Sequence, residues 1–320
     1  MNNKLDISVV ICTHTEARWK FLVEAVKSIQ FQKVHPKEII VVIDNNPKLA
    51  KKVRNHLPNV IAVENSGMRG ASDSKNSGIA SAKSSIVAFL DDDAVASSDW
   101  LVKLTSGFYK PEVCGVGGKT EPLWPGEQPN WFPEEFYWVV GCTHRGMPEI
   151  IEPVRNLIAC NMAVRLEVFS EVGGFRNEIG PAGVHALGCE ETEFCIRANQ
   201  YYSQNLWIHQ PKAIVQHQVP ASRESFTYFL RRCYGEGRSK ALVTYFVGSE
   251  DGLSSERKYL SEIIPGGISQ GIRDVLIERD IWGFARAGAI LVGLTVTVVG
   301  YLIGISLLSL AKNSDFNNLR

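Results

Sequence analysis

The sequence lacks the cysteine spacing of a zinc site or of a disulfide framework. Its 320 residues include seven cysteines, an odd number, and no two of them form a CxxC pair. An excess of charge of one sign is also missing, because 34 basic residues balance 34 acidic ones. We therefore expect a reducing environment, no structural zinc and no nucleic-acid partner.

Two common nucleotide-binding fingerprints are missing as well. Neither GxGxxG nor GxxxxGK[ST] occurs, which argues against a dinucleotide fold and a P-loop. The opening stretch MNNKLDISVVICT has no long apolar segment followed by a small-residue cleavage site, so we expect a strand there and no signal peptide. We find no internal repeats or low-complexity segments. The length suits one large α/β domain with appendages, or two small domains.

Strand and helix patterns alternate through the first hundred residues. Apolar, β-branched runs occupy 7–13, 38–44, 59–65 and 84–90, and helical spacing occupies 18–30, 48–57 and 70–83. This alternation predicts an α/β fold with a mostly parallel, doubly wound sheet. Three strands end in polar residues, namely Thr13, Asp44 and Asp91. Ligands bind at that edge of such sheets, so we expect a nucleotide pocket there.

The most informative stretch is the run Asp91-Asp92-Asp93 directly after the fourth strand. Carboxylates so placed can share a hard divalent cation that keeps open positions for phosphate oxygens. An acidic turn or a helix cap is the alternative. The preceding loop and helix, 65–80, carry three glycines and Lys75. A helix N-terminus with a lysine can hold a diphosphate, and an ordinary strand-to-helix loop would have the same composition.

Two further groups could take part in chemistry. Glu190, Glu191 and Glu193 crowd into the expected first turn of a helix, where a carboxylate can act as general base or merely compensate the helix dipole. His217 follows a short apolar strand at 213–215 and could complete a metal site with the aspartates. A structural histidine is the alternative.

The C-terminal part differs in composition. From 287 to 311, 25 consecutive residues carry no charge, which predicts one membrane span; a buried core helix is the alternative. Arg286 and Lys312 bracket this run, and the bias of basic residues places the larger N-terminal part in the cytoplasm. The region 263–284 could lie along the membrane surface or pack as an ordinary helix. The aromatic insert at 121–138 could bind sugar rings or lipid tails, or form a small satellite core.

Taken together, the motifs resemble those of family 2 glycosyltransferases, which are inverting enzymes with the GT-A fold. The resemblance covers roughly residues 6 to 220. Its motifs, in order, are VVICT, EIIVVIDN, GASDSKNSG, FLDDDA, ACNMAVR, VGGF and CEETEFCIR.

The resemblance implies roles in donor binding. Thr13 and Asp44 would contact the base and ribose. Lys75 would meet the diphosphate where the family usually has arginine, with the charge kept and the bidentate fork lost. Asp91 and Asp93 would form the DxD pair that contacts donor and metal, and Asp93 would be the firmer metal ligand.

The remaining roles are less tightly defined by the motifs. Asp92 is grouped with the donor-binding residues but is expected to point away and to be the most replaceable of the three aspartates. Glu191 falls where the family places its catalytic base, usually an aspartate, so Glu190 stays an alternative. His217 resembles the histidine that joins the metal or the diphosphate.

The function implied is inverting transfer of one sugar from a nucleotide-diphosphate sugar to a hydroxyl of a saccharide or lipid-linked saccharide. We expect a UDP-sugar donor, Mg²⁺ or Mn²⁺ as cofactor, and a part in cell-surface or exported polysaccharide synthesis. The absence of QxxRW and the single apolar segment argue against a processive synthase. A polyprenyl-phosphate glycosyltransferase and an inactive, membrane-tethered binding module remain alternatives.

The expected organisation follows from these segments. Residues 1–250 form the catalytic domain, with a nucleotide-binding half at 1–112 and an acceptor half at 113–250. A juxtamembrane helical region at 251–286 precedes the span at 287–311 and a tail at 312–320. Membrane lipid is an expected partner, and no oligomeric state is predicted.

Overall fold

The first half of the chain builds the parallel part of a sheet. In a computed structural model, residues 6–179, 187–203 and 207–317 are described, with side chains as far as residue 310. Four parallel strands lie in the order β3-β2-β1-β4. They are β1 (Ile7–Thr13), β2 (Glu38–Ile43), β3 (Ile61–Glu64) and β4 (Ile86–Asp91). The helices between them are a 3-10 turn η1 (Glu16–Arg18), α1 (Trp19–Gln30), α2 (Pro47–His56) and α3 (Ala71–Ser81). These elements confirm the predicted alternation.

Both faces of this sheet are covered, which explains why its strands read as continuous apolar runs. On one face, α1, α2 and α4 (Trp100–Ser106) bury Leu22, Leu49 and Leu101 against alternate strand residues. On the other face, α3 approaches so closely that a Cβ on Gly78 would contact Val10 and Val42. Burial on both faces fixes the register, so the polar strand ends meet at one edge.

The second half of the chain extends the sheet with both parallel and antiparallel strands. The predicted parallel pairing holds among β1, β2, β3 and β4. The order continues β4-β8-β6-β9-β5, with β7 paired to β9, which makes nine strands in the described residues. Here β4-β8, β6-β8, β5-β9 and β7-β9 are antiparallel, and β6-β9 is parallel. The elements are β5 (Ala94–Ala96), β6 (Gly115–Leu123), η2 (Glu134–Val140), β7 (Glu152–Val154), β8 (Asn161–Arg165), α5 (Leu166–Val172), α6 (Glu190–Tyr202), β9 (Trp207–Gln218) and η3 (Ala221–Arg223).

The aromatic insert forms a satellite core, which decides between its two sequence interpretations. Phe132 and Phe136 are fully buried and pack against Phe229 of α7 (Phe226–Val247) and against Ile290. Phe132 and Phe229 meet edge to face, with ring centroids 5.6 Å apart, a favourable aromatic geometry. The insert therefore ties the sheet to the C-terminal helices.

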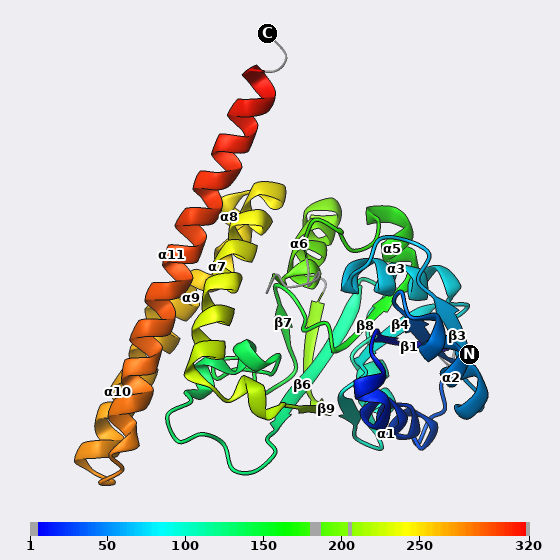
Figure 1. The fold of residues 1–320 in the computed structure, drawn as a ribbon, viewed down its shortest axis with the longest axis horizontal. Coiled ribbons are helices and arrows are strands. Elements are labelled where there is room, and N and C mark those ends of the chain that lie inside the picture. Colours follow the sequence, from blue (N-terminus) through cyan, green and yellow to red (C-terminus); the bar gives the residue numbers. More distant parts are fainter. Residues whose placement is uncertain (1–5, 180–186, 204–206, 318–320) are drawn as a thin grey trace.

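The C-terminal helices stack on one side of the molecule (Figure 1). They are α7, α8 (Ser249–Gly252), α9 (Ser254–Lys258), the π-helical turn η4 (Tyr259–Ile263), α10 (Ile264–Leu276) and α11 (Trp282–Asn317). Within α11, Trp282–Leu310 is long and apolar enough to cross a membrane, with mean hydropathy 2.3. The helix continues into the stretch predicted as a tail, of which 318–320 lie outside the described residues.

Glycines set the contact between α7 and α11. A Cβ on Gly237 of α7 would collide with the backbone carbonyl of Thr297, and one on Gly300 with that of Tyr234. A Cβ on Gly304 would lie 2.6 Å from that of Ala241. The two helix backbones therefore touch along this seam, which leaves no room for side chains.

We expect Gly237→Ala to lower the free energy of unfolding by about 1–3 kcal/mol, because the added methyl overpacks the seam. Gly288→Ala on α11 is the matched control, since a Cβ there meets nothing within 4 Å. It should be neutral or slightly stabilising, because alanine favours a helix. Chemical unfolding of the full chain in detergent measures both. Equal stability of the two variants would contradict this tight seam.

Candidate active site

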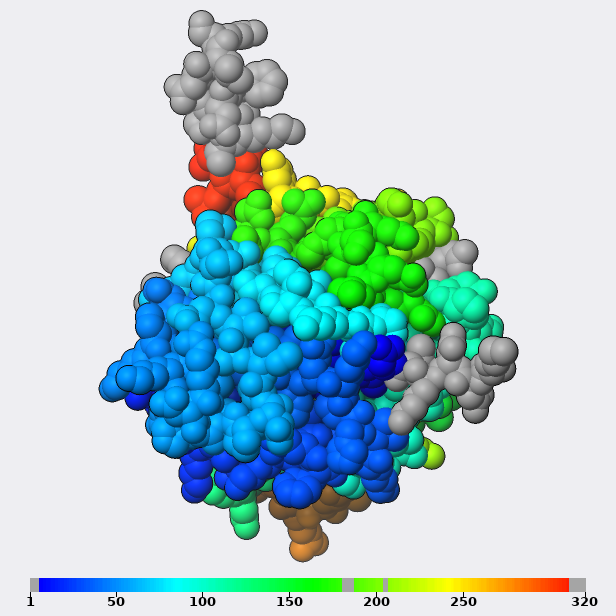
Figure 2. Space-filling view, turned by 90° about the vertical axis from the view of Figure 1, so that its right-hand side faces the viewer, coloured from blue at the N-terminus to red at the C-terminus, as the bar shows by residue number. Residues whose placement is uncertain are grey.

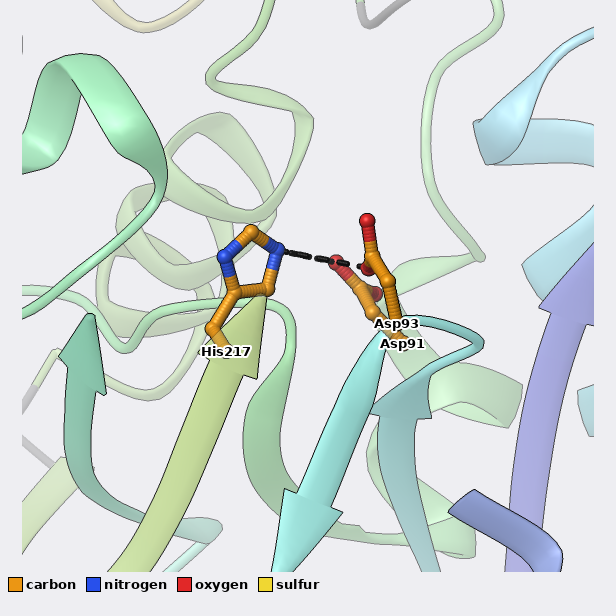
Figure 3. A group of neighbouring side chains, drawn as sticks. All are labelled: Asp91, Asp93 and His217. Atoms are coloured by element: carbon orange, nitrogen blue, oxygen red, sulfur yellow. Dashed lines mark ion pairs between the residues drawn. The ribbon is translucent and has the colours of Figure 1, made fainter. Parts of the chain in front are cut away.

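Strand pairing brings Asp91, Asp93 and His217 together. Asp91 ends β4, the chain turns through the next two residues, and β5 then pairs with β9 so that Ala94 lies opposite His217. One ligand atom from each of the three side chains lies within 4.8 Å of the others. The Nε2 atom of His217 is 3.3 Å from Asp93 Oδ1 and 4.0 Å from Asp91 Oδ2. Figure 3 shows the imidazole ring facing the two carboxylates.

The donor set of this triad fits a divalent cation. Asp93 Oδ1 is buried, and among the described residues its one polar neighbour is His217 Nε2, at 3.3 Å and outside normal hydrogen-bond geometry. A divalent cation could take the place of the histidine proton and bind this oxygen and the imidazole together. Two carboxylates and one imidazole leave coordination positions for phosphate oxygens. The nitrogen ligand suits Mn²⁺ better than Mg²⁺, which prefers oxygen ligands throughout.

The charges of the triad are mutually stabilised in the protein without metal. Burial alone would raise the pKa of Asp93, but His217, Arg18 and Arg223 outweigh it and lower this pKa to about 2. Burial likewise opposes a charged imidazole, yet Asp93 raises the pKa of His217 to about 10. Burial and the charge of Asp93 raise the pKa of Asp91. A metal that binds His217 must therefore displace a proton, so metal affinity should rise with pH.

The contacts of Asp92 argue against the prediction that it is the most replaceable of the three aspartates. Its side chain is buried, accepts a hydrogen bond from Thr13 Oγ1 at 2.7 Å and one from Arg18 Nη1 at 2.8 Å. Arg18 also lies 3.1 Å from Asp93 Oδ2. Asp92 thus anchors the arginine that neutralises the acidic turn. The alternation of an extended strand does not apply at this position, because the chain turns there.

Asp92→Ala should lower the free energy of unfolding by about 1–3 kcal/mol, because the buried Thr13 hydroxyl and the partly buried Arg18 both lose a charged hydrogen-bond acceptor. Asp99→Asn is the matched control, since the Asp99 side chain is partly exposed, lies 3.9 Å from Lys103, and is replaced by a residue that also suits the N-cap of α4. Exposed pairs of this kind contribute less than about 1 kcal/mol. Thermal unfolding without metal compares the two variants. If both lose the same stability, Asp92 does not have this anchoring role.

The two candidate bases occupy different environments at the start of α6. Glu190 Oε1 accepts a hydrogen bond from Lys75 Nζ at 2.6 Å, and both side chains are buried. Burial disfavours the lysine's charge, but Glu190 and then Asp91 raise the pKa of Lys75 above its usual range. Burial, followed by the charge of Glu190, raises the pKa of Glu191 to about 8. Glu190 is thus paired with Lys75, whereas Glu191 can gain or lose a proton near neutral pH.

Asp44 serves the loop before α3. Its carboxylate accepts hydrogen bonds from Asn65 Nδ2 at 2.9 Å and from the backbone N–H of Gly70 at 3.0 Å. These bonds fix the start of α3 and hence the position of Lys75. Thr13 and Asp44 thus lie at the ends of neighbouring strands, as predicted, and both are already hydrogen-bonded within the protein.

Sequence reasoning missed two cations beside the triad, Arg18 in η1 and Arg223 in η3. Both lie in short turns without a motif, and each is brought to the site by tertiary packing. The one sequence signal for these arginines is their position shortly after predicted site residues: Arg18 follows Thr13, and Arg223 follows His217, by a few residues.

Comparison with known proteins identifies the family. The model of glycosyl transferase family 2 matches residues 8–173. A glucosyl-dolichyl phosphate glucuronosyltransferase of Haloferax volcanii is 29% identical over 317 residues, covering 97% of this chain and 100% of that protein. A succinoglycan biosynthesis protein of Rhizobium meliloti is 23% identical over 252 residues, covering 74% of this chain and 75% of that protein.

Solved structures share the fold. A mannosyltransferase from Pyrobaculum calidifontis, in complex with GDP-Man and Mn²⁺, aligns with a TM-score of 0.59 and 15% identity, covering 94% of this chain and 88% of that one. A GalNAc-T7 structure with UDP, GalNAc and Mn²⁺ aligns with a TM-score of 0.54 and 16% identity, covering 84% and 58%. The fold is GT-A, and with a family model matching more than half of its length, the chain belongs to glycosyl transferase family 2.

Proposed function

We propose that the enzyme transfers one sugar, with inversion, from a UDP-sugar to a hydroxyl of a polyprenyl-phosphate-linked saccharide, and that the reaction requires Mn²⁺. The observation that carries the proposal is the position of Lys75. Lys75 donates a hydrogen bond to Glu190, and the charges of Glu190, Asp91 and Glu191 all raise its pKa, so one cation lies near both the metal triad and the candidate base. A donor diphosphate and an acceptor hydroxyl would meet there.

Each residue then has a role that its surroundings support. Asp91, Asp93 and His217 would hold the cation, which supplies charge neutralisation for the departing diphosphate when bound. Lys75, Arg18 and Arg223 would add positive charge around the same phosphates. Thr13 and Asp44 would contact the base and ribose at the neighbouring strand ends.

Glu191 would act as general base. It would take the proton of the acceptor hydroxyl while the hydroxyl oxygen attacks C1 of the sugar opposite the nucleotide. The bond from C1 to the diphosphate oxygen breaks as the new glycosidic bond forms, so the anomeric centre inverts. No covalent enzyme intermediate is needed, and positioning accounts for much of the acceleration.

The acceptor class is inferred from the Haloferax volcanii relative, whose name specifies a glucosyl-dolichyl phosphate acceptor and a glucuronosyl donor group. Its full-length match favours a lipid-linked sugar over bare polyprenyl phosphate. UDP-glucuronic acid is accordingly the first donor to test. An inactive binding module is disfavoured, because the metal triad and Glu191 are both present.

A thermal-shift panel tests this proposal directly. UDP- and GDP-sugars are added to the full chain with Mn²⁺, and the stabilised mixtures are then given polyprenyl-phosphate glucose. A bound donor at about 100 times its Kd should add roughly 2.7 kcal/mol of stability. Mass spectrometry should then detect a lipid-linked disaccharide. A panel without any shift, or a shift without product on any lipid-linked acceptor, would refute the proposal.

A further inference from the structure

The helix α11 has two apolar faces, and only one of them packs on the protein. The packed face carries Gly293, Gly300 and Gly304, which contact α7 and the aromatic insert. The opposite face is exposed over several turns. Its large side chains are Leu291, Val292, Val298, Val299, Leu302 and Ile303, each at least 40% exposed. Apolar residues so regularly exposed on one face of a helix need an apolar partner.

The turn between α10 and α11 adds to this surface. Leu276, Ile277 and Ile281 are each at least 70% exposed, and Trp282 and Phe284 beside them are also exposed. The outer side of α10 forms an apolar groove of about 500 Å³, lined by Pro265, Ile268, Ser269, Ile272, Arg273, Leu276 and Ile277. More than half of the exposed large apolar side chains in the described residues lie on these two helices and the turn between them.

The contact with α7 opposes a simple membrane crossing. A crossing helix needs about 20 residues. Any 20 consecutive residues of Trp282–Leu310 include both Gly293 and Gly300, which contact Phe229 and Tyr234 of α7. A crossing α11 would therefore draw α7 into the hydrocarbon. That helix carries Arg231, Arg232, Glu236, Arg238 and Lys240, and charges at the bilayer centre are costly.

We propose that α10 and α11 lie in the plane of a lipid bilayer, with their exposed faces in the headgroup and acyl boundary, and that α11 does not cross the membrane. A helix that lies in a membrane interface usually turns a charged face toward water. The inner face of α11 packs against the catalytic domain instead, so this helix can be apolar on both faces. The rest of the molecule, including the N-terminal face in Figure 2, stays in solvent.

Charge and aromatic placement favour lipid over a second copy of the chain. Arg273 lines the apolar groove and Arg279 lies in the turn; both are exposed, and with the exposed Glu278 between them they leave a net positive charge that can meet headgroup phosphates. Trp282 follows this turn at the start of α11, a position typical of interfacial aromatics. The inference stands on helix packing, so it holds whichever acceptor the enzyme uses.

Topology provides the first test. The full chain, with a different epitope tag at each end, is expressed in cells, and membrane vesicles of both orientations are treated with protease. The in-plane arrangement predicts that both tags are cleaved from the same side of the membrane. Cleavage of the two tags from opposite sides would show that α11 crosses, and would overturn the proposal.

Liposome flotation provides the second test and uses matched variants. Val299→Glu with Leu302→Glu places two charges on the outer face of α11, at sites 45% and 58% exposed. Bound protein should fall at least about tenfold relative to wild type on vesicles of phosphatidylcholine with phosphatidylglycerol. Phe31→Glu, 77% exposed directly after α1, is the control and should bind as wild type does. Unfolding temperatures confirm that each variant is folded.

Two flotation results would refute the proposal. One is a double variant that floats as well as wild type. The other is a double variant that changes a dimer to a monomer, by light scattering, without losing lipid binding. The latter would assign the exposed face to self-association.

Discussion

Replacing Asp93 by asparagine should lower the rate of sugar transfer by about 100-fold or more, because the site loses a charged metal ligand. Asparagine keeps the size of the side chain but removes its negative charge. The charge matters because Asp93 contacts both His217 and Arg18. In the asparagine variant, Arg18 and His217 would repel the metal ion more strongly, because one fewer carboxylate balances their charge.

Metal titration separates this effect from misfolding. Wild type treated with a chelator should lose transfer and recover it with Mn²⁺, whereas Asp93→Asn should recover little at the same Mn²⁺ concentration. Asp99→Asn, at the partly exposed partner of Lys103, should behave as wild type. Full metal-dependent turnover by Asp93→Asn would show that the triad does not hold the cofactor.

Glu191→Gln should lower kcat by about 10²–10⁴-fold, the usual contribution of a general base. Glutamine matches the shape of glutamate and cannot accept the hydroxyl proton. Donor binding should persist, because the metal triad and Lys75 are untouched. Initial rates measure the first effect, and the thermal shift with donor and Mn²⁺ measures the second. A variant that turns over as fast as wild type would exclude Glu191 as the base.

The pH profile follows from the same residue. Burial and then the charge of Glu190 raise the pKa of Glu191 to about 8, and only the carboxylate form can act as base. At saturating Mn²⁺, where metal affinity no longer limits the rate, kcat/KM should therefore rise with pH up to about 8 and then level off.

Glu190→Gln removes a neighbouring negative charge and frees Lys75, so the rising limb should move to lower pH. If the rising part of the kcat/KM profile stays at the same pH in this variant, a group other than Glu191 controls it.

Local chemistry explains how much of the fold could be predicted. The runs that became β1, β2 and β4 are apolar and β-branched because both faces of each strand are buried, and that requirement is visible in a single sequence. Parallel strands end at one edge, so the residues Thr13, Asp44 and Asp91 could be placed together from the strand pattern alone. Glu190 and Glu191 do open a helix, as their position before an apolar pattern indicated.

Tertiary contacts explain what could not be predicted. The role of Asp92 depends on Arg18, which lies 74 positions earlier and reaches it through the packing of η1 against the strand ends. The pairing of Lys75 with Glu190 spans 115 positions. The apolar run of α11 indicated a membrane partner, but the glycine seam with α7 leaves no mark in hydropathy. The mixed half of the sheet likewise depends on long-range pairing.

The configuration of the product tests the central claim most directly. The enzyme is incubated with Mn²⁺, an α-linked nucleotide sugar accepted in the donor panel and a lipid-linked acceptor, and the new linkage is assigned by proton NMR from its anomeric coupling. Direct displacement with Glu191 as base predicts a β-linked product. An α-linked product would mean that configuration is retained, and would contradict the mechanism proposed for this site.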